Sequence, residues 1–281
     1  MKVFTTKEAL QEYILPLKQS GKKTGFVPTM GALHDGHLAL VKNSVENNDI
    51  TVVSIFVNPT QFDNPDDLKK YPRDLETDIT LLQTISPDIL VFAPDAYNFY
   101  DGRIASQSFD FDGLEQVMEG KHRPGHFDGV GTVVKKLFEI VQPDTAYFGE
   151  KDFQQLQIIK KLVQKFSLPI QIVPVPIYRA ADGLAMSSRN KRLTPMHREA
   201  APFIYQVLRQ ASLLSQSQSF DQIRHFVTKA IDAHPLLELE YFEIANQENL
   251  QPARHKVAGN KYRGFIVVYA GDVRLIDNIE L

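Results

Sequence analysis

Two histidines three residues apart have the clearest potential for chemistry in this sequence. His34 and His37 lie in the segment PTMGALHDGH, residues 28–37, which joins an apolar run to a helical pattern. The first N–H groups of a helix lack partners within the helix, and the helix dipole favours an anion there. Gly31 and Gly36 allow the backbone to approach a phosphate closely. We therefore interpret the segment as a site where imidazoles donate hydrogen bonds to a reacting phosphate.

Two other interpretations of the histidine pair are weaker. A polar turn with incidental histidines would explain either residue alone, but the spacing of the pair at a helix start disfavours it. A zinc site needs a third ligand, and no further histidine lies nearby in a chain that contains no cysteine.

Amide side chains follow the most apolar run of the chain. Residues 50–57 read ITVVSIFV, and Asn58 and Gln61 come directly after them. Amides both donate and accept hydrogen bonds, which suits hydroxyls and carboxylates. The end of a buried parallel strand is also where such a sheet presents ligand contacts. Taken alone, however, an ordinary turn at Asn58-Pro59 is the simpler explanation.

A third group of polar residues lies in GEKDFQQ, residues 149–155. Lys151 can pair with a phosphate at a helix start, and Asp152 can cap that helix or bind a ribose hydroxyl. Gln155 lies one helical turn beyond Lys151 and therefore faces the same side. A capped helix with solvated charges explains these residues equally well.

Two further polar segments are open to both a functional and a plain interpretation. Ser187, Ser188 and Arg189 supply two hydroxyls and a guanidinium that suit a triphosphate, or they belong to a polar loop between domains. Residues 122–131, HRPGHFDGVG, fit a loop over phosphate or a plain connection between elements.

The elements that must position these segments alternate between strand and helix over the first two thirds of the chain. Apolar runs at 50–57 and 89–92 alternate with helical patterns at 74–85 and 151–166. This order predicts an α/β fold with a parallel sheet, which binds ligands at the carboxyl ends of its strands.

The pattern changes after about residue 177. Two helical patterns are followed there by three strand patterns, at residues 195–214, 220–233, 237–244, 264–269 and 273–276. We therefore expect two domains, a parallel-sheet domain over residues 1–176 and a smaller α+β domain over residues 177–281.

The composition excludes several classes of protein. The 281 residues include 31 Lys and Arg and 34 Asp and Glu, so the net charge of −3 and pI near 6.2 leave no overall basic surface for nucleic acid or an anionic membrane. The absence of cysteine excludes disulfides, thiolate metal sites and a cysteine nucleophile. The first residues lack an apolar signal core, and no apolar run approaches the ~20 residues of a membrane helix. We expect a cytoplasmic enzyme or binding protein.

Taken together, the motifs resemble those of the pantoate–β-alanine ligases. PTMGALHDGH, SIFVNPTQF, FGEKDFQQ and GLAMSSRN occur here in the order typical of that family. YPRD at residues 71–74, RPGHFDGV at 123–130 and, weakly, LIDN at 275–278 are also similar to it. The HxGH motif alone would indicate only the wider superfamily of nucleotidylyltransferases and class I synthetases.

The resemblance implies an AMP-forming ligase that condenses (R)-pantoate with β-alanine. In this reaction the pantoate carboxylate attacks the α-phosphorus of ATP and releases pyrophosphate, and the amine of β-alanine then attacks the pantoyl adenylate and releases AMP. The resemblance also implies Mg²⁺ with ATP, a Rossmann-like first domain that binds ATP and pantoate, and a cytoplasmic homodimer without nucleic-acid or membrane partners.

The resemblance also assigns roles to residues of this chain. The catalytic group comprises His37 as the proton donor, His34, Lys151 and Arg189. Pantoate is expected at Gln61 and Gln155, with Asn58 also in the substrate site and Gln61 also near β-alanine. The residues expected to line the ATP site are Met30, Gly31, Ala32, Leu33, His34, Asp35, Gly36, His37, Gly149, Glu150, Lys151, Asp152, Tyr178 through its backbone, Met186, Ser187, Ser188 and Arg189. No ligands for Mg²⁺ are indicated.

Two other functions remain as alternatives. A different adenylyl- or cytidylyltransferase would explain HxGH but not the paired Gln61 and Gln155. A non-catalytic nucleotide-binding regulator is disfavoured because the residues expected to act on ATP are intact, namely His34, His37, Lys151 and Arg189.

Overall fold

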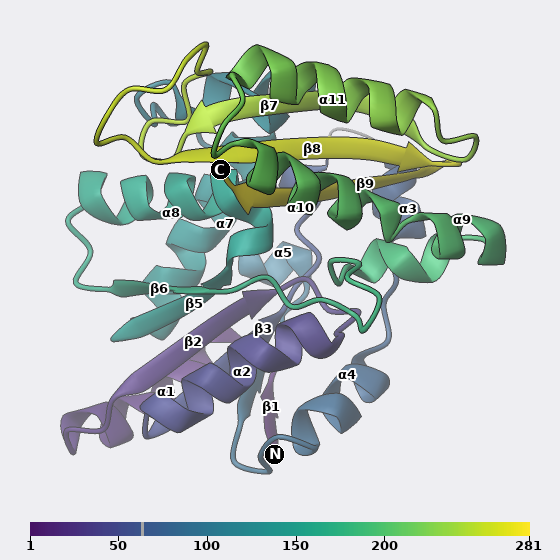
Figure 1. Ribbon diagram of the computed structural model, residues 1–281. Helices are drawn as coiled ribbons and strands as arrows, with labels where there is room; N and C mark the ends of the chain where they lie inside the picture. Colours follow the sequence, from purple (N-terminus) through teal and green to yellow (C-terminus); the bar gives the residue numbers. More distant parts are fainter. Residues whose placement is uncertain (63–64) are drawn as a thin grey trace. The chain divides into compact units, whose positions relative to one another are not determined.

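The chain folds as two units in the computed structural model, which describes residues 1–62 and 65–281 (Figure 1). The first unit comprises Met1–Glu150 and Gln155–Pro176, and the second comprises Lys151–Gln154 and Ile177–Leu281. The short segment Lys151–Gln154 thus belongs with the later part of the chain.

A six-stranded parallel sheet forms the centre of the first unit, in the order β1-β4-β3-β2-β5-β6. The strands are β1 (Lys2–Phe4), β2 (Thr24–Thr29), β3 (Ile50–Ile55), β4 (Leu90–Phe92), β5 (Thr145–Gly149) and β6 (Gln171–Val175). The order runs from β2 to β4 in one direction and from β5 to β6 in the other, so the switch point lies between β2 and β5. Ligands bind at such points in open parallel sheets.

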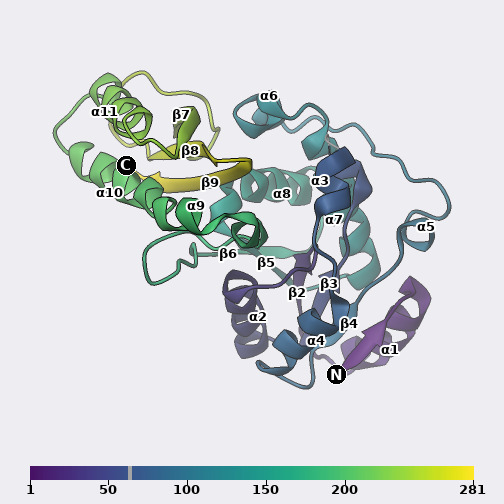
Figure 2. The same ribbon diagram turned by 90° about the vertical axis from the view of Figure 1, so that its right-hand side faces the viewer.

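Helices cover both faces of this sheet. Figure 2 shows α2 and α4 on one face and α1 and α7 on the other, and α2 packs on β2, β3 and β5. The helices of the unit are α1 (Lys7–Gln19), α2 (Asp35–Asn47), α3 (Pro65–Lys70), α4 (Leu75–Gln83), α5 (Ala96–Phe99), α6 (Glu119–His122) and α7 (His126–Val141), with 3₁₀ turns η1 (Pro59–Gln61) and η2 (Leu114–Gln116). The 3₁₀ turn η3 (Glu150–Asp152) and helix α8 (Phe153–Lys165) follow β5 and include the segment Lys151–Gln154 of the second unit. The α/β fold class is therefore confirmed.

One apolar cluster lies beneath α2 and α4. Val27, Val53 and Val91 of three adjacent strands meet Leu82 of α4 and Leu33 of the loop after β2. Leu33 is 1% exposed, so its side chain anchors that loop in the core.

The second unit is an antiparallel sheet of β7 (Glu238–Asn246), β8 (Tyr262–Ala270) and β9 (Val273–Glu280). Helices α10 (Phe203–Leu214) and α11 (Phe220–Asp232) pack on it, and their apolar faces form one core with the sheet. The smaller α+β fold expected for this part of the chain is confirmed (Figure 1).

Two details differ from the sequence-based expectation. The single helix expected over 195–214 is broken into α9 (Pro195–Ala200) and α10, because Pro202 interrupts it. Strand β9 continues to Glu280 rather than ending at Ile276, and the residues added include Asp277 and Asn278. Both are buried although they are polar, so an apolar pattern could not include them.

None of the helices among the described residues is long and apolar enough to span a membrane.

Candidate active site

The two histidines of the HxGH motif stand at the start of α2. His34 is the N-cap residue with an extended backbone, and its carbonyl accepts hydrogen bonds from the N–H groups of His37 and Leu38. The two imidazole rings stack with centroids 4.0 Å apart and planes inclined by 25°. The structure thus brings both rings to one helix end, where the dipole favours an anion.

A left-handed turn precedes His34 and is held by a carboxylate from α4. Gly31 and Ala32 have φ values of 78° and 50°. Asp78 is 2% exposed, and its carboxylate accepts hydrogen bonds from the N–H of Ala32 at 3.0 Å and of Leu33 at 2.7 Å. A left-handed backbone at a residue other than glycine costs free energy, and these two bonds offset that cost.

The close approach of Asp78 explains the glycine at position 31. A Cβ atom on Gly31 would lie 2.9 Å from Oδ2 of Asp78 and 3.1 Å from Cγ2 of Ile55. The sequence analysis did not identify Asp78. Its signal is that it precedes the buried Leu82 by four residues, which places a carboxylate on the buried face of α4.

Asn58 and Gln61 form a hydrogen-bonded pair after β3. Asn58 is 1% exposed, and its Nδ2 donates to Oε1 of Gln61 at 3.1 Å and to the carbonyl of Gly129 at 3.2 Å. Its Oδ1 accepts a hydrogen bond from the hydroxyl of Tyr100 at 2.6 Å. Nε2 of Gln61 lies 2.8 Å from Sδ of Met30. The buried amide of Asn58 therefore orients the half-buried amide of Gln61 beside Met30.

The segment 122–131 packs against the same turn. His126 begins α7, and its Nδ1 donates to the carbonyl of Gln61 at 2.8 Å while its Nε2 accepts from Arg123 at 3.3 Å. A Cβ atom on Gly129 would lie 2.4 Å from the carbonyl oxygen of Thr60, so α7 can approach η1 this closely only with glycine there. Residues 126–131 are thus the first turns of a packed helix.

The residues of GEKDFQQ divide between the two units. Gln155 lies half-buried in the first turns of α8 and belongs to the first unit. Lys151 and Asp152 belong to the second unit, with Nζ of Lys151 3.7 Å from a carboxylate oxygen of Asp152. The Lys151 carbonyl accepts a hydrogen bond from Nδ2 of Asn278 at 2.9 Å.

A short hairpin in the second unit presents the MSSRN segment. Arg179 pairs with Ala185 in an antiparallel bridge, and the N–H of Met186 donates to the carbonyl of Tyr178 at 3.0 Å. Ser187 then caps the 3₁₀ turn η4 (Ser188–Arg192) by accepting from the N–H of Arg189 at 3.3 Å. Residues 186–189 therefore follow directly from the end of this hairpin.

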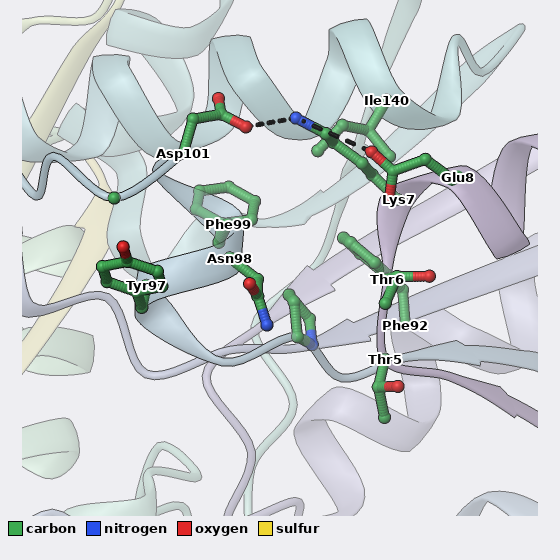
Figure 3. A pocket seen from close by; sticks show the side chains of 12 residues that line it. Thr5, Thr6, Lys7, Glu8, Phe92, Tyr97, Asn98, Phe99, Asp101 and Ile140 are labelled. Carbon is green, nitrogen blue, oxygen red and sulfur yellow. Dashed lines mark hydrogen bonds and ion pairs between the residues drawn. The ribbon is translucent and has the colours of Figure 1, made fainter.

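A pocket of about 330 Å³ lies elsewhere in the first unit, near the start of α1 (Figure 3). Lys136, at 2.6 Å, and Lys7 both bind the carboxylate of Asp101, and these two ammonium groups lower the pKa of Asp101 to about 2. The described residues that line this pocket include none of the side chains predicted to bind substrates.

Within residues 1–62 and 65–281, no group of three or more histidine, aspartate or glutamate side chains is placed to hold a metal ion. Mg²⁺ favours one or two carboxylates together with substrate phosphates over a cage built entirely by protein.

A parallel sheet with a histidine pair at the helix start beyond its switch point defines the first unit as a Rossmann-like fold, a class that binds nucleotides. Comparison with known proteins identifies the family within that class. The model of the Pantoate-beta-alanine ligase family matches residues 2–280, and the chain belongs to this family.

Individual relatives agree with this assignment. The chain is 54% identical to the pantothenate synthetase of Flavobacterium psychrophilum over 281 residues, which are 100% of both chains. It is 48% identical to that of Bacteroides thetaiotaomicron over 280 residues, 100% of this chain and 99% of the relative.

Solved structures of the family have the same fold. Pantothenate synthetase from Thermus thermophilus superposes with a TM-score of 0.91 at 41% identity, covering 100% of this chain and 99% of that one. The Francisella tularensis pantoate–β-alanine ligase, a complex with β-γ ATP and β-alanine, gives a TM-score of 0.81 at 38% identity, covering 100% and 97%.

Proposed function

We propose that this protein is an AMP-forming pantoate–β-alanine ligase that works through a pantoyl adenylate. The match to the ligase family over residues 2–280 carries this proposal, and the histidine pair at the start of α2 supports it. Pyrophosphate release, measured with ATP, pantoate and β-alanine, tests it. Pyrophosphate should form with ATP and pantoate, and pantothenate only when β-alanine is added. Pyrophosphate release without pantoate would indicate another adenylyltransferase.

The residues of the first unit can stabilise the charge that develops on the α-phosphate. His34 and His37 stack at one helix end, and we assign His37 as the donor to the phosphate during attack by the pantoate carboxylate. The loop before them contributes backbone from Met30 to Leu33, with Asp35 and Gly36 at the start of α2. Such a site needs positioning and charge stabilisation but no protein nucleophile.

In the second unit, we assign cationic and hydroxyl groups to ATP. Lys151 and Arg189 are the cations, and Ser187 and Ser188 supply hydroxyls. Asp152, the backbone of Tyr178 and Met186 complete the ATP contacts expected in this unit, and Gly149 and Glu150 of the first unit are also expected to contact ATP. Mg²⁺ would enter bound to the ATP phosphates, whose charge it neutralises.

The pantoate contacts proposed here are the amides of Gln61 and Gln155. Gln61 is oriented by Asn58, so we assign Asn58 a positioning role, with Gln61 also near β-alanine. A site built to bind a hydroxyl strongly rejects an analogue that lacks it, because its polar groups are then left unpaired. The wild type should therefore use an acid without the 2-hydroxyl very poorly.

Gln155→Leu tests the pantoate assignment. In this variant the ratio of pyrophosphate release from pantoate and from its deoxy analogue should shrink, as pantoate itself binds less tightly. An unchanged ratio would show that Gln155 does not contact the hydroxyls of the substrate.

We further propose a cytoplasmic homodimer, with a Rossmann-like domain for ATP and pantoate over residues 1–176 and a smaller domain over residues 177–281 that adds the ATP contacts at Tyr178 and residues 186–189. These assignments rest on the resemblance of the motifs to the family. Light scattering coupled to size exclusion tests the dimer, for which a mass of about twice 31.9 kDa is expected.

A further inference from the structure

Three buried polar residues interrupt the apolar sheet of the second unit. Arg263 of β8 and Asp277 and Asn278 of β9 are 7%, 6% and 2% exposed. Burying a charged or amide side chain costs free energy unless it is hydrogen-bonded, so these residues require partners. Asp277 and Asn278 are the last two residues of LIDN, a motif for which the proposed reaction has so far supplied no role.

Asn278 connects Arg263 to the turn that contains Lys151. Its Oδ1 accepts from the Arg263 guanidinium at 2.5 Å, and its Nδ2 donates to the Lys151 carbonyl at 2.9 Å. Because the guanidinium can only donate, it defines which end of the amide points to Lys151. The same guanidinium lies over the ring of Phe153, 4.2 Å from its centroid, and this ring also contacts Phe265. The segment Lys151–Gln154 is thus seated on β8 and β9.

Asp277, the preceding residue, holds a different segment. Successive side chains of a strand point to opposite faces. The Asp277 carboxylate accepts two hydrogen bonds from Arg179, at 2.6 and 2.9 Å, and Arg179 also donates to the carbonyl of Gly183 at 3.1 Å and stacks on the ring of Tyr205. Arg179 belongs to the hairpin from which residues 186–189 follow.

The charges around Asp277 agree with this arrangement. Burial raises the pKa of Asp277, while Arg179, the N–H of Asn278 and the positive charge of Lys151 oppose that rise. The carboxylate therefore interacts with cations on both segments.

We propose that strand β9 is a positioning element for the ATP-binding residues of the second unit: Asn278 positions the Lys151 turn, and Asp277 positions the hairpin that leads to Arg189. The proposal rests on the ATP contacts assigned above to Lys151 and Arg189. Two consecutive residues on one strand hold two separate segments, so they set the distance between the two cations. A misplacement of about 1 Å far from the reacting atoms can cost roughly 100-fold in rate.

The variant Asn278→Asp removes the bond to the Lys151 carbonyl. It keeps the acceptor for Arg263, has nearly the same volume, and replaces the donor to the Lys151 carbonyl by an oxygen. We expect kcat/KM for ATP to fall about 10- to 100-fold, with the affinity for pantoate unchanged within about twofold, because the proposed pantoate contacts lie in the first unit. Ser215→Ala is the matched control, since it removes another hydrogen bond of a buried residue in the second unit, from the Ser215 hydroxyl to the Ser212 carbonyl at 2.8 Å, and involves neither segment.

A double-mutant cycle separates positioning from general destabilisation. If Asn278 acts through Lys151, Asn278→Asp should have much less effect on kcat/KM for ATP in a Lys151→Ala background. Additive effects would overturn the proposal, as would an equal loss of affinity for ATP and pantoate. If Asn278→Asp does not fold, Asn278→Ala, which removes the donor to the Lys151 carbonyl without adding a charge, replaces it in the same cycle with the same two outcomes.

The cycle also distinguishes failure of this proposal from failure of the proposed function. If Lys151→Ala leaves ATP use unchanged, the ATP assignment of Lys151 is wrong, and the positioning proposal falls with it. If Lys151→Ala weakens ATP use but Asn278→Asp does not, only the positioning role is overturned.

Discussion

In the first unit a single buried carboxylate holds the loop before His34, whereas in the second unit two neighbouring side chains of β9 hold two separate segments. Asp78 lies 46 and 45 residues from the backbone groups it binds. Asn278 lies 127 residues from Lys151, and Asp277 lies 98 residues from Arg179. The Asp78 bonds link two successive crossovers of one sheet, whereas the bonds of Asp277 and Asn278 need the last strand of the chain.

This difference concerns the parts of the chain on which each half depends. The loop of the first unit depends on Asp78 of α4. The Lys151 turn and the hairpin depend on Asn278 and Asp277 of β9, which pairs with β8. Loss of β9 would therefore disturb Lys151 and Arg189 and leave the Asp78 bonds intact. Substitutions in both units test this contrast.

His37→Ala removes the donor at the helix start of the first unit. Loss of one such donor typically costs about 10²–10³ in kcat, so pyrophosphate release should fall by that factor in a protein with a normal circular dichroism spectrum. Lys42→Ala, an exposed change on the same helix, should leave the rate unchanged. Near-normal turnover in folded His37→Ala would remove His37 from the mechanism.

Lys151→Ala tests the second unit. A hydrogen bond to a charged group is worth about 1.5–3 kcal/mol, so the Kd for ATP should rise roughly 10- to 100-fold. Pantoate affinity, measured in parallel by calorimetry, should hardly change. Lys165→Ala, at the far end of α8 and paired with Asp112, is the control. A selective loss of pantoate affinity would reverse the assignment.

Asp78→Asn tests whether the Asp78 carboxylate positions the loop before His34. The amide keeps one acceptor oxygen, so one of the N–H groups of Ala32 and Leu33 loses its partner. The free energy of unfolding should fall by about 1–3 kcal/mol, and pyrophosphate release by roughly tenfold. Urea unfolding and the activity assay measure the two effects.

The control for Asp78→Asn is a substitution in the same core that lowers the free energy of unfolding by a similar amount. Ile89→Val, at a residue that is 1% exposed, should cost about 0.5–1.5 kcal/mol without touching the loop. Full activity in both variants would show that Asp78 stabilises the fold without positioning the site.

Asp101→Asn, beside the pocket in Figure 3, should have the smallest effect and no effect on catalysis. Lys136 and Lys7 lower the pKa of Asp101 from 3.8 to about 2. The ion pairs of Asp101 therefore stabilise the fold fully at pH values above the pKa that Asp101 has in the unfolded chain, and this stabilisation is lost as the pH falls toward 2. The stability difference between wild type and variant should stay constant above about pH 5 and shrink below about pH 4. Urea unfolding from pH 3 to 7 measures this, and a difference that grows in acid would contradict it.

Local patterns in the sequence predicted most of the fold. The run at 50–57 became β3, and the helix expected over 220–233 is α11, which begins at a capping box of Ser219 and Gln222. Both depend on neighbours close in the chain. The prediction of a single helix over residues 195–214 was wrong in one respect, because Pro202 divides this stretch into two helices.

The candidate site was predictable where its residues follow strands. The start of α2 places His34 and His37 together through helix geometry alone, and their spacing in the sequence already implies it. Asn58 was predicted as a substrate contact, but its amide is buried and bonded to Gln61, Gly129 and Tyr100. Its partners lie up to 71 residues away, which no local pattern reports.

The α/β class, the family and the histidine pair are predictable from local sequence, because strand and helix periodicity and the motif spacings depend on neighbouring residues. The roles of Asp78, Asp277 and Asn278 depend on contacts that form only in the folded protein. A polar residue in a helix or strand normally indicates a surface facing solvent. Here the backbone groups and guanidinium that make burial favourable come from 45 to 127 residues away, and only folding brings them within hydrogen-bonding distance.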